Sequence, residues 1–333
     1  MSVNVDFAKG AVNSFAASGS PTYGSDGVSF TVAKGGDAPQ LASLFYIMFG
    51  RVEITMKAAP GAGIVSSLVL ESDTLDEIDI EWLGSNPDEI QTNYFGKGQT
   101  TTYNRGQFHS VSGTQDNWIK YTVDWTKDRI IWMAGDQVVR ELKVADAETN
   151  QYPQTPMQVK FGAWAGGDPN TNPPGTVEWA RGPTDYSKGP FSMLVKSVSI
   201  SDYSTGKEYK YKDTSGSWES IEAVDGAING NYKNGNAITA TATVAGSSAP
   251  KPTSGAGVPV GGIAKDGSEA TKTQTGWPWV GDNRPTGGSI PSGWYMTPEG
   301  KIMRESAAVN LSKPSISLVA VTVMLPLLGI LAL

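Results

Sequence analysis

Residues 75–83 read LDEIDIEWL, a stretch in which acidic and apolar side chains alternate. Successive side chains of a β-strand point to opposite faces, so Glu77, Asp79 and Glu81 share one face. The other face carries the apolar side chains and one acid: Asp76, Ile78, Ile80 and Trp82. This alternation predicts a strand that buries its isoleucines in a β-sandwich and turns three acids to the opposite side.

Similar short segments recur throughout residues 1–222. They are rich in valine, isoleucine, threonine and aromatic residues, and glycine, proline, asparagine and aspartate separate them: 27–34, 46–58, 64–72, 119–126, 129–135, 157–164 and 193–203. No window shows the apolar period of a helix over helical length. Residues 128–141 are expected to form a hairpin that turns at Ala134–Asp136. The pattern predicts an all-β protein with an antiparallel sandwich or barrel.

The spacing of the acids suggests a reaction. Glu77 and Glu81 are four residues apart, about 13 Å between Cα atoms on a flat strand. Side chains that lean together can bring the carboxylates to about 5–5.5 Å, the separation of a retaining glycosidase. With Asp79 between them, like charges raise at least one pKa. A carboxyl with a raised pKa serves as general acid, while its ionised neighbour serves as nucleophile.

Two other interpretations of the same acids remain open at this point: a solvated acidic strand face and a calcium site. The surrounding residues favour a carbohydrate site, because sugars offer apolar faces and hydroxyl rims to aromatic and planar polar side chains. The candidate substrate-binding residues follow the acids or lie beside glycines farther on: Gln91, Asn93, Tyr94, Trp164, Thr176 and Trp179. Trp125 and Trp132 lie in regular strand patterns and are expected in the core.

The composition argues against several other classes of protein. The chain has one histidine, His109, and no cysteine, so a histidine-dependent triad and a zinc site both lack residues. We expect no metal and no cofactor. The net charge is −7 and no basic stripe is visible, so a nucleic-acid partner is not expected.

The chain changes character after about residue 222. We expect a linker rich in Gly, Ala, Ser and Thr at 223–274 and a polar, tryptophan-containing segment at 275–305. Residues 306–333 combine small residues, a polar spacer and an uncharged apolar tail, as GPI-attachment signals do, with Ser306 as the attachment residue. A tail-anchored transmembrane helix is the alternative. The first residues form no signal peptide, although GPI attachment requires one, so we expect a signal that this sequence lacks.

Several motifs together resemble a known family. LESDTLDEIDIEWLG, QTNYFGKG, PMQVKFGAWAGGD and GTVEWARGPTDYSKGPF are similar to the fungal cell-wall transglycosylases of glycoside hydrolase family 16, the congo-red-hypersensitive type that links chitin to β-glucan. The resemblance covers roughly residues 5–222. It implies a jelly-roll sandwich with a concave sugar-binding cleft, Glu77 as nucleophile, Glu81 as acid/base and Asp79 as the assisting acid.

The resemblance also implies substrates and a location. Chitin is the expected donor, and β-glucan or chitin the acceptor, at the cell wall or the outer face of the plasma membrane. We expect a monomer that reaches the membrane only through its GPI anchor. Two alternatives remain: a β-1,3(4)-glucan endohydrolase and a non-catalytic glycan-binding wall protein.

Overall fold

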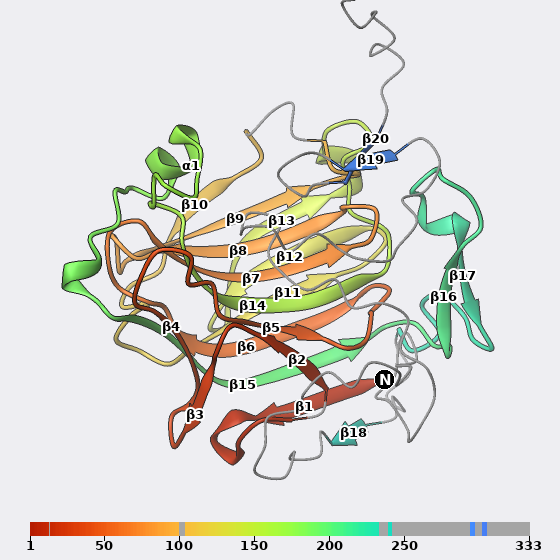
Figure 1. The fold of residues 1–333 in the computed structure, drawn as a ribbon. Coiled ribbons are helices and arrows are strands. Elements are labelled where there is room, and N and C mark those ends of the chain that lie inside the picture. The colour runs from red at the N-terminus through yellow and green to blue at the C-terminus, as the bar shows by residue number, and fades with distance from the viewer. Residues whose placement is uncertain (13, 100–103, 233–238, 242–293, 297–301, 305–333) are drawn as a thin grey trace, which may run out of the picture.

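Two large sheets stack face to face in the computed structural model of the chain (Figure 1). The structure describes residues 1–12, 14–99, 104–232, 239–241, 294–296 and 302–304. Apart from one parallel pair, β1 with β18, the strand pairs are antiparallel. The predicted all-β sandwich is confirmed.

The first sheet has nine strands in the order β13-β12-β11-β6-β15-β1-β18, with β4 also on β15 and β3 on β4. Their bounds are β1 (Ser2–Asp6), β3 (Thr22–Gly24), β4 (Gly27–Val32), β6 (Gly50–Lys57), β11 (Ile119–Trp125), β12 (Arg129–Ala134), β13 (Gln137–Lys143), β15 (Phe191–Asp202) and β18 (Thr239–Thr241). The expected hairpin is present, because β12 and β13 pair Ala134 with Gln137.

The second sheet has seven strands in the order β10-β9-β8-β7-β14-β5-β2. Their bounds are β2 (Phe15–Ser18), β5 (Gln40–Ser43), β7 (Ile64–Ser72), β8 (Glu77–Leu83), β9 (Glu89–Phe95), β10 (Gln107–Ser110) and β14 (Met157–Ala165). Strands β7 and β14 are buried along their whole length, so this sheet is covered on both faces at its centre.

Smaller elements surround the sandwich. Two hairpins are formed by β16 (Glu208–Tyr211) with β17 (Ile221–Val224) and by β19 (Trp294–Met296) with β20 (Ile302–Arg304). The helical turns are η1 (Phe7–Lys9), η2 (Val144–Asp146), η3 (Tyr186–Lys188), η4 (Trp218–Ser220) and the helix α1 (Pro174–Trp179). Helix α1 lies beside the β9–β10 edge of the seven-stranded sheet, and the β16–β17 hairpin lies at the other end of the molecule (Figure 1).

One predicted strand begins later than expected. The sequence predicts a strand over 46–58, but β6 begins at Gly50. Phe49, with φ of 60°, adopts a left-handed conformation that an extended strand cannot contain. From Gly50 onward the burial alternates, with Val52, Ile54 and Met56 inward.

The core lies between the two sheets. Ile78, Ile80, Trp125 and Trp132 have no exposed surface, as the sequence predicts. Burying side chains of this size contributes about 1.5–3 kcal/mol each. Trp132 also donates from Nε1 to the main-chain carbonyl of Asp79, 3.1 Å away. This bond ties the nine-stranded sheet to the middle of β8, the strand that carries the acids.

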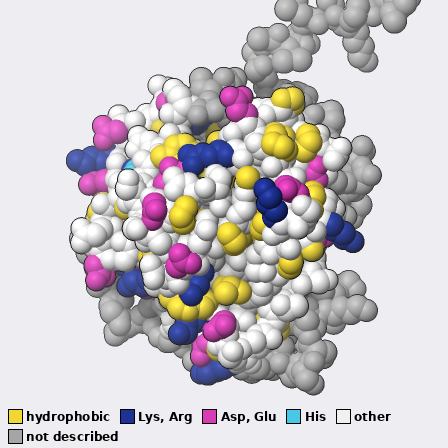
Figure 2. Space-filling view, turned by 90° about the vertical axis from the view of Figure 1, so that its left-hand side faces the viewer, with side chains coloured by type: hydrophobic (Ala, Val, Ile, Leu, Met, Phe, Trp, Pro, Cys, Tyr) yellow, Lys and Arg dark blue, Asp and Glu magenta, His cyan; other side chains and the backbone are white. Residues whose placement is uncertain are grey.

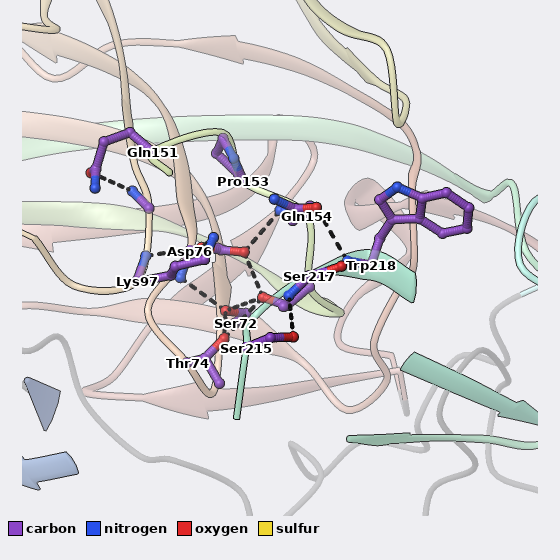
Figure 3. A network of polar contacts seen from close by, with 12 residues as sticks. Ser72, Thr74, Asp76, Lys97, Gln151, Pro153, Gln154, Ser215, Ser217 and Trp218 are labelled. Atoms are coloured by element: carbon purple, nitrogen blue, oxygen red, sulfur yellow. Dashed lines mark hydrogen bonds and ion pairs between the residues drawn. The ribbon is translucent and has the colours of Figure 1, made fainter. Parts of the chain in front are cut away.

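A buried network fixes the start of β8 (Figure 3). The carboxylate of Asp76 accepts hydrogen bonds from the main-chain N–H groups of Lys97 (2.9 Å) and Gln154 (2.8 Å) and from the Thr155 hydroxyl (2.7 Å). Its own N–H donates to the hydroxyl of Ser72. The fourth acid of the stretch therefore points away from the other three, as strand alternation predicts, and holds three loops together.

Packing contacts among the described residues continue beyond residue 222. Residue 222 falls inside β17, which extends to Val224. Asn231 donates from Nδ2 to the carbonyls of Asp202 (3.3 Å) and Ser204 (3.0 Å), and the ring of Tyr232 lies 5.2 Å from that of Tyr203. The sequence changes in character before these contacts are complete, so composition alone placed the boundary inside a strand.

The other predictions for the C-terminal third lie mostly outside the described residues. These are the linker beyond Tyr232, most of the tryptophan-containing segment, the GPI signal and Ser306. Within the described part of the chain, no helix is long and apolar enough to span a bilayer. Acidic and basic side chains are interspersed over the face drawn in Figure 2.

Candidate active site

The three acids of β8 lie on the outer face of the seven-stranded sheet. Ile78 and Ile80 point into the core, so their neighbours in β8 point to the other side. We call this outer face the acid face. The strand register places Gln91 opposite Glu81 and Asn93 opposite Asp79, so these two predicted residues share the acid face. All of them come from β8 and β9, whose antiparallel pairing brings the QTN sequence alongside the acids.

Burial and crowding change the protonation of these acids. Burial, followed by the charge of Glu77, raises the pKa of Glu81 to about 8. Burial also raises the pKa of Asp79 well above its usual value, with added contributions from the charges of Glu77 and Glu81 and from a hydrogen bond to Glu77. The sequence predicted raised pKa values from like charge, but burial is the larger cause. At neutral pH, Glu81 therefore holds a proton beside Glu77, and the pKa of Asp79 between them is raised as well.

Helix α1 brings an aromatic side chain over the acid face. Trp179, the last residue of α1, donates from Nε1 to Oε1 of Gln91, 2.9 Å away. Its ring stacks on that of Trp164, with centroids 6.2 Å apart and planes inclined by 25°. Trp179 is partly exposed, whereas only 4% of Trp164 is exposed. Trp164 therefore supports the ring of Trp179 from below, and Trp179 is the ring that a ligand can touch.

The glycines beside these tryptophans do not keep space open for a ligand. A Cβ on Gly167 would lie 2.5 Å from the Cα of Gly63 and 2.9 Å from the Cα of Gly182. The chain after β14 therefore packs backbone to backbone against the segment that follows α1. Thr176 lies within α1, where its N–H and carbonyl make helical hydrogen bonds. The sequence showed no helical period here because α1 has only six residues.

The expectation that Tyr94 lines a sugar site is wrong. Tyr94 pairs with Ile78, is 3% exposed and belongs to the core cluster. Its ring lies near the guanidinium of Arg140, and its hydroxyl accepts from the N–H of Glu148. It is one residue out of phase with Gln91 and Asn93, so it points to the other face of β9.

The sequence analysis missed three side chains near the acids. Lys160 and Glu71 form an ion pair on the acid face, and Phe108 of β10 pairs with Gln91 at its edge. Phe108 is 46% exposed, and the guanidinium of Arg181 lies 5.3 Å from its ring centre. The alternation rule applied to β7, β14 and β10 would have placed these side chains only if the strand order had been known.

A comparison with known families identifies the class of protein. The model of the "Glycosyl hydrolases family 16" matches residues 9–181. The chain belongs to this family of glycosyl hydrolases, which agrees with the sandwich and the row of acids.

The relatives narrow this class further. Crh-like protein 4 of Botryotinia fuckeliana (strain B05.10) is 55% identical over 320 residues, which cover 94% of this chain and 83% of that protein. Congo red hypersensitive protein 1 of Saccharomyces cerevisiae is 53% identical over 210 residues, 63% of this chain and 41% of that protein. The resemblance inferred from the sequence motifs is thus confirmed.

Solved structures of related proteins support the same class of enzyme and the same fold. The Crh5 transglycosylase in complex with NAG is 50% identical, with a TM-score of 0.65 over 67% of this chain and 92% of that one. A Bacillus licheniformis β-glucanase at 21% identity shares the fold, with a TM-score of 0.52 over 60% of this chain and 98% of that one. The chain is a glycoside hydrolase-type enzyme, similar to the fungal Crh transglycosylases.

Proposed function

We propose that the chain transfers glycosyl units by double displacement, with Glu77 as nucleophile and Glu81 as general acid and base. The observation that carries this proposal is the difference in protonation along β8. Glu81, with a pKa of about 8, holds a proton at neutral pH on the same face as Glu77. Asp79, whose pKa burial raises, is hydrogen-bonded to Glu77, which positions that carboxylate and stabilises its charge.

The first step forms a covalent intermediate. Glu81 gives its proton to the oxygen of the scissile glycosidic bond as that bond breaks, and a carboxylate oxygen of Glu77 bonds to the anomeric carbon. In the second step, the ionised Glu81 takes a proton from a hydroxyl of the acceptor sugar. That oxygen bonds to the anomeric carbon, the ester to Glu77 breaks, and both acids return to their starting states.

The proposed donor is chitin, and the proposed acceptor is β-glucan or chitin in the fungal cell wall. The NAG bound by the related Crh5 transglycosylase is a unit of chitin, which supports this donor. Trp179 offers a partly exposed ring for the apolar face of a sugar and half-buried Asn93 an amide for its hydroxyls, while buried Gln91 holds the Trp179 indole in place. We propose that the enzyme acts outside the cell as a monomer and that Ser306 carries a GPI anchor.

A transfer assay on the full chain tests this function. The protein is incubated with a chitin oligosaccharide donor and a fluorescent laminarin-type acceptor, and the labelled products are sized. We expect labelled products longer than the acceptor, which Glu77→Gln abolishes. Glu53→Gln is the matched control, because Glu53 pairs with Arg51 on the other sheet, and its activity should equal that of the parent.

Other results of this assay favour other functions. Free reducing sugar without a labelled product would indicate a hydrolase. Glycan binding without turnover by the parent would indicate a non-catalytic wall protein. Cleavage of β-1,3(4)-glucan but not of chitin would support the endohydrolase alternative.

A further inference from the structure

A buried ion pair lies beside the acids on the same face of the sheet. Lys160 Nζ is 2.5 Å from Glu71 Oε2, and the two side chains are only 2% and 3% exposed. The other carboxylate oxygen of Glu71 has no hydrogen-bond partner among the described residues. Taking both charges out of water costs free energy, so the pair needs an explanation beyond stability.

The strand register brings this pair to the acids. Glu71 of β7 stands directly opposite Glu77 of β8. Lys160 of β14 stands opposite Val69, which in turn stands opposite Asp79. Directly opposed side chains in an antiparallel pair have Cβ atoms about 4.5–5.5 Å apart. Glu71 is therefore an immediate neighbour of Glu77, and Lys160 is the cation that neutralises it.

Three acids and two cations, Lys160 and Arg105, lie around Glu77. Its neighbours on its own and the nearby strands are Asp79 and Glu81 of β8, Glu71 of β7, Lys160 of β14 and Phe95 of β9. The guanidinium of Arg105 lies 4.8 Å from the centre of the Phe95 ring. Arg105 is itself paired with Glu148. On the far side of Glu71, Asp73 accepts a hydrogen bond from the hydroxyl of Tyr46.

We propose that Lys160 is a positioning residue of the reaction, which cancels the charge of Glu71 so that Glu77 can carry the negative charge with which it attacks. This inference rests on the proposed role of Glu77. Glu71 acts on the acids of β8, because its charge is one of the causes that raise the pKa of Asp79. Without Lys160, an uncompensated carboxylate would face Glu77 in a site with little water.

Two single substitutions test this inference, because they should move the acidic limb of the pH profile in opposite directions. Lys160→Met leaves Glu71 unneutralised, so the ionisation of Glu77 becomes harder and the acidic limb of the kcat/KM–pH profile moves to higher pH. We expect the midpoint of this limb to move by about one pH unit, so that well below the midpoint kcat/KM falls about tenfold relative to the parent at the same pH. Glu71→Gln leaves the cation and moves the acidic limb to lower pH. The double variant E71Q/K160M removes both charges and should restore the limb of the parent.

The controls separate this inference from the function on which it rests. Lys120→Met removes a cation from an ion pair with Glu53 on the other sheet and should leave the profile unchanged. Thermal melts report whether each variant folds. If Lys160→Met does not fold, the pH profile of Glu71→Gln tests the inference. The inference is overturned if the acidic limb of the kcat/KM–pH profile keeps the position of the parent in both single variants. It is also overturned if this limb stays displaced in the double variant. Activity in Glu77→Gln would instead overturn the proposed function.

Discussion

Glu81 determines how the reaction should respond to alkaline pH. As general acid it must be protonated, and burial together with the charge of Glu77 raises its pKa to about 8. We expect kcat/KM for transfer to be flat below about pH 7, to be about half its plateau value near pH 8, and to approach a tenfold fall per pH unit above about pH 9. A pH profile of the labelled transfer reaction measures this limb. A rise in kcat/KM between pH 7 and 9 would contradict the role of Glu81.

Residue-scale features were predictable where strand alternation decides them. The alternation in LDEIDIEWL correctly placed Glu77, Asp79 and Glu81 on one face and Asp76 on the other. The same rule, applied to QTNY, would have placed Tyr94 in the core. The burial of Asp79 was not predictable, because it depends on side chains of other strands, such as Glu71 of β7, whose places next to β8 the local sequence does not give.

At the scale of elements, the start of β8 depends on Asp76. Its carboxylate accepts from two N–H groups and one hydroxyl and is completely buried. Asp76→Asn should lower the free energy of unfolding by about 2–3 kcal/mol, because the new amide cannot accept at every one of these contacts. Urea denaturation measures the loss. Asp116→Asn, at an exposed position, is the control, and equal stability of the two variants would contradict this role.

Helix α1 contributes to the site through Trp179. Trp179→Ala removes the exposed ring and its hydrogen bond to Gln91, so binding of the sugar should weaken. We expect KM for the oligosaccharide to rise about tenfold, about 1.4 kcal/mol, with a smaller change in kcat. Steady-state kinetics with the labelled acceptor separate the two parameters. A fall in kcat at unchanged KM would show that the ring acts on the chemistry and not on binding.

The strands were predictable as elements and α1 was not. Most predicted segments match observed strands to within two residues, since β-branched residues and turn residues alternate clearly there. Six residues give too little sequence to show a helical period. The glycines near Trp164 do not identify a ligand site, because close packing of two backbones requires glycine just as an open ligand site does.

The whole molecule should lose stability as the pH rises. Burial raises the pKa of Asp202 to about 7 in the folded state, and Asp79 and Glu81 are raised as well. An acid with a raised folded-state pKa binds its proton more tightly when folded. Its contribution is therefore complete below the unfolded pKa of about 4 and is lost as the pH approaches the folded value, about 1.4 kcal/mol per unit. Urea denaturation at pH 5 and pH 9 should show lower stability at pH 9.

Asp202→Asn separates the contribution of this residue. Its Oδ1 accepts from the N–H groups of Met48 and Ser204, and its Oδ2 accepts from the hydroxyl of Tyr209. Asparagine can keep the first two bonds, and its amide can donate to the Tyr209 oxygen. In this variant, we expect the free energy of unfolding to change less with pH between pH 4 and 7 than it does in the parent. A slope equal to that of the parent would show that Asp202 does not titrate in this range.

The arrangement of the two sheets was beyond sequence analysis. Strand β1 pairs with β15 almost two hundred positions away, with Val3 opposite Ile200, and no local pattern indicates such a pairing. The bond from Trp132 to the carbonyl of Asp79 joins the sheets beneath the acids. The sequence indicated only that Trp132 is a core residue.

The central claim is that Glu77 forms a covalent bond to the donor sugar. The most direct test uses the Glu81→Gln variant of the full chain and a chitin oligosaccharide with a good leaving group, which needs no acid to depart. The first step then proceeds while the second, without its base, is slow. Peptide mass spectrometry should find one glycosyl adduct on Glu77. No adduct, or an adduct on another residue such as Asp79, would contradict the account.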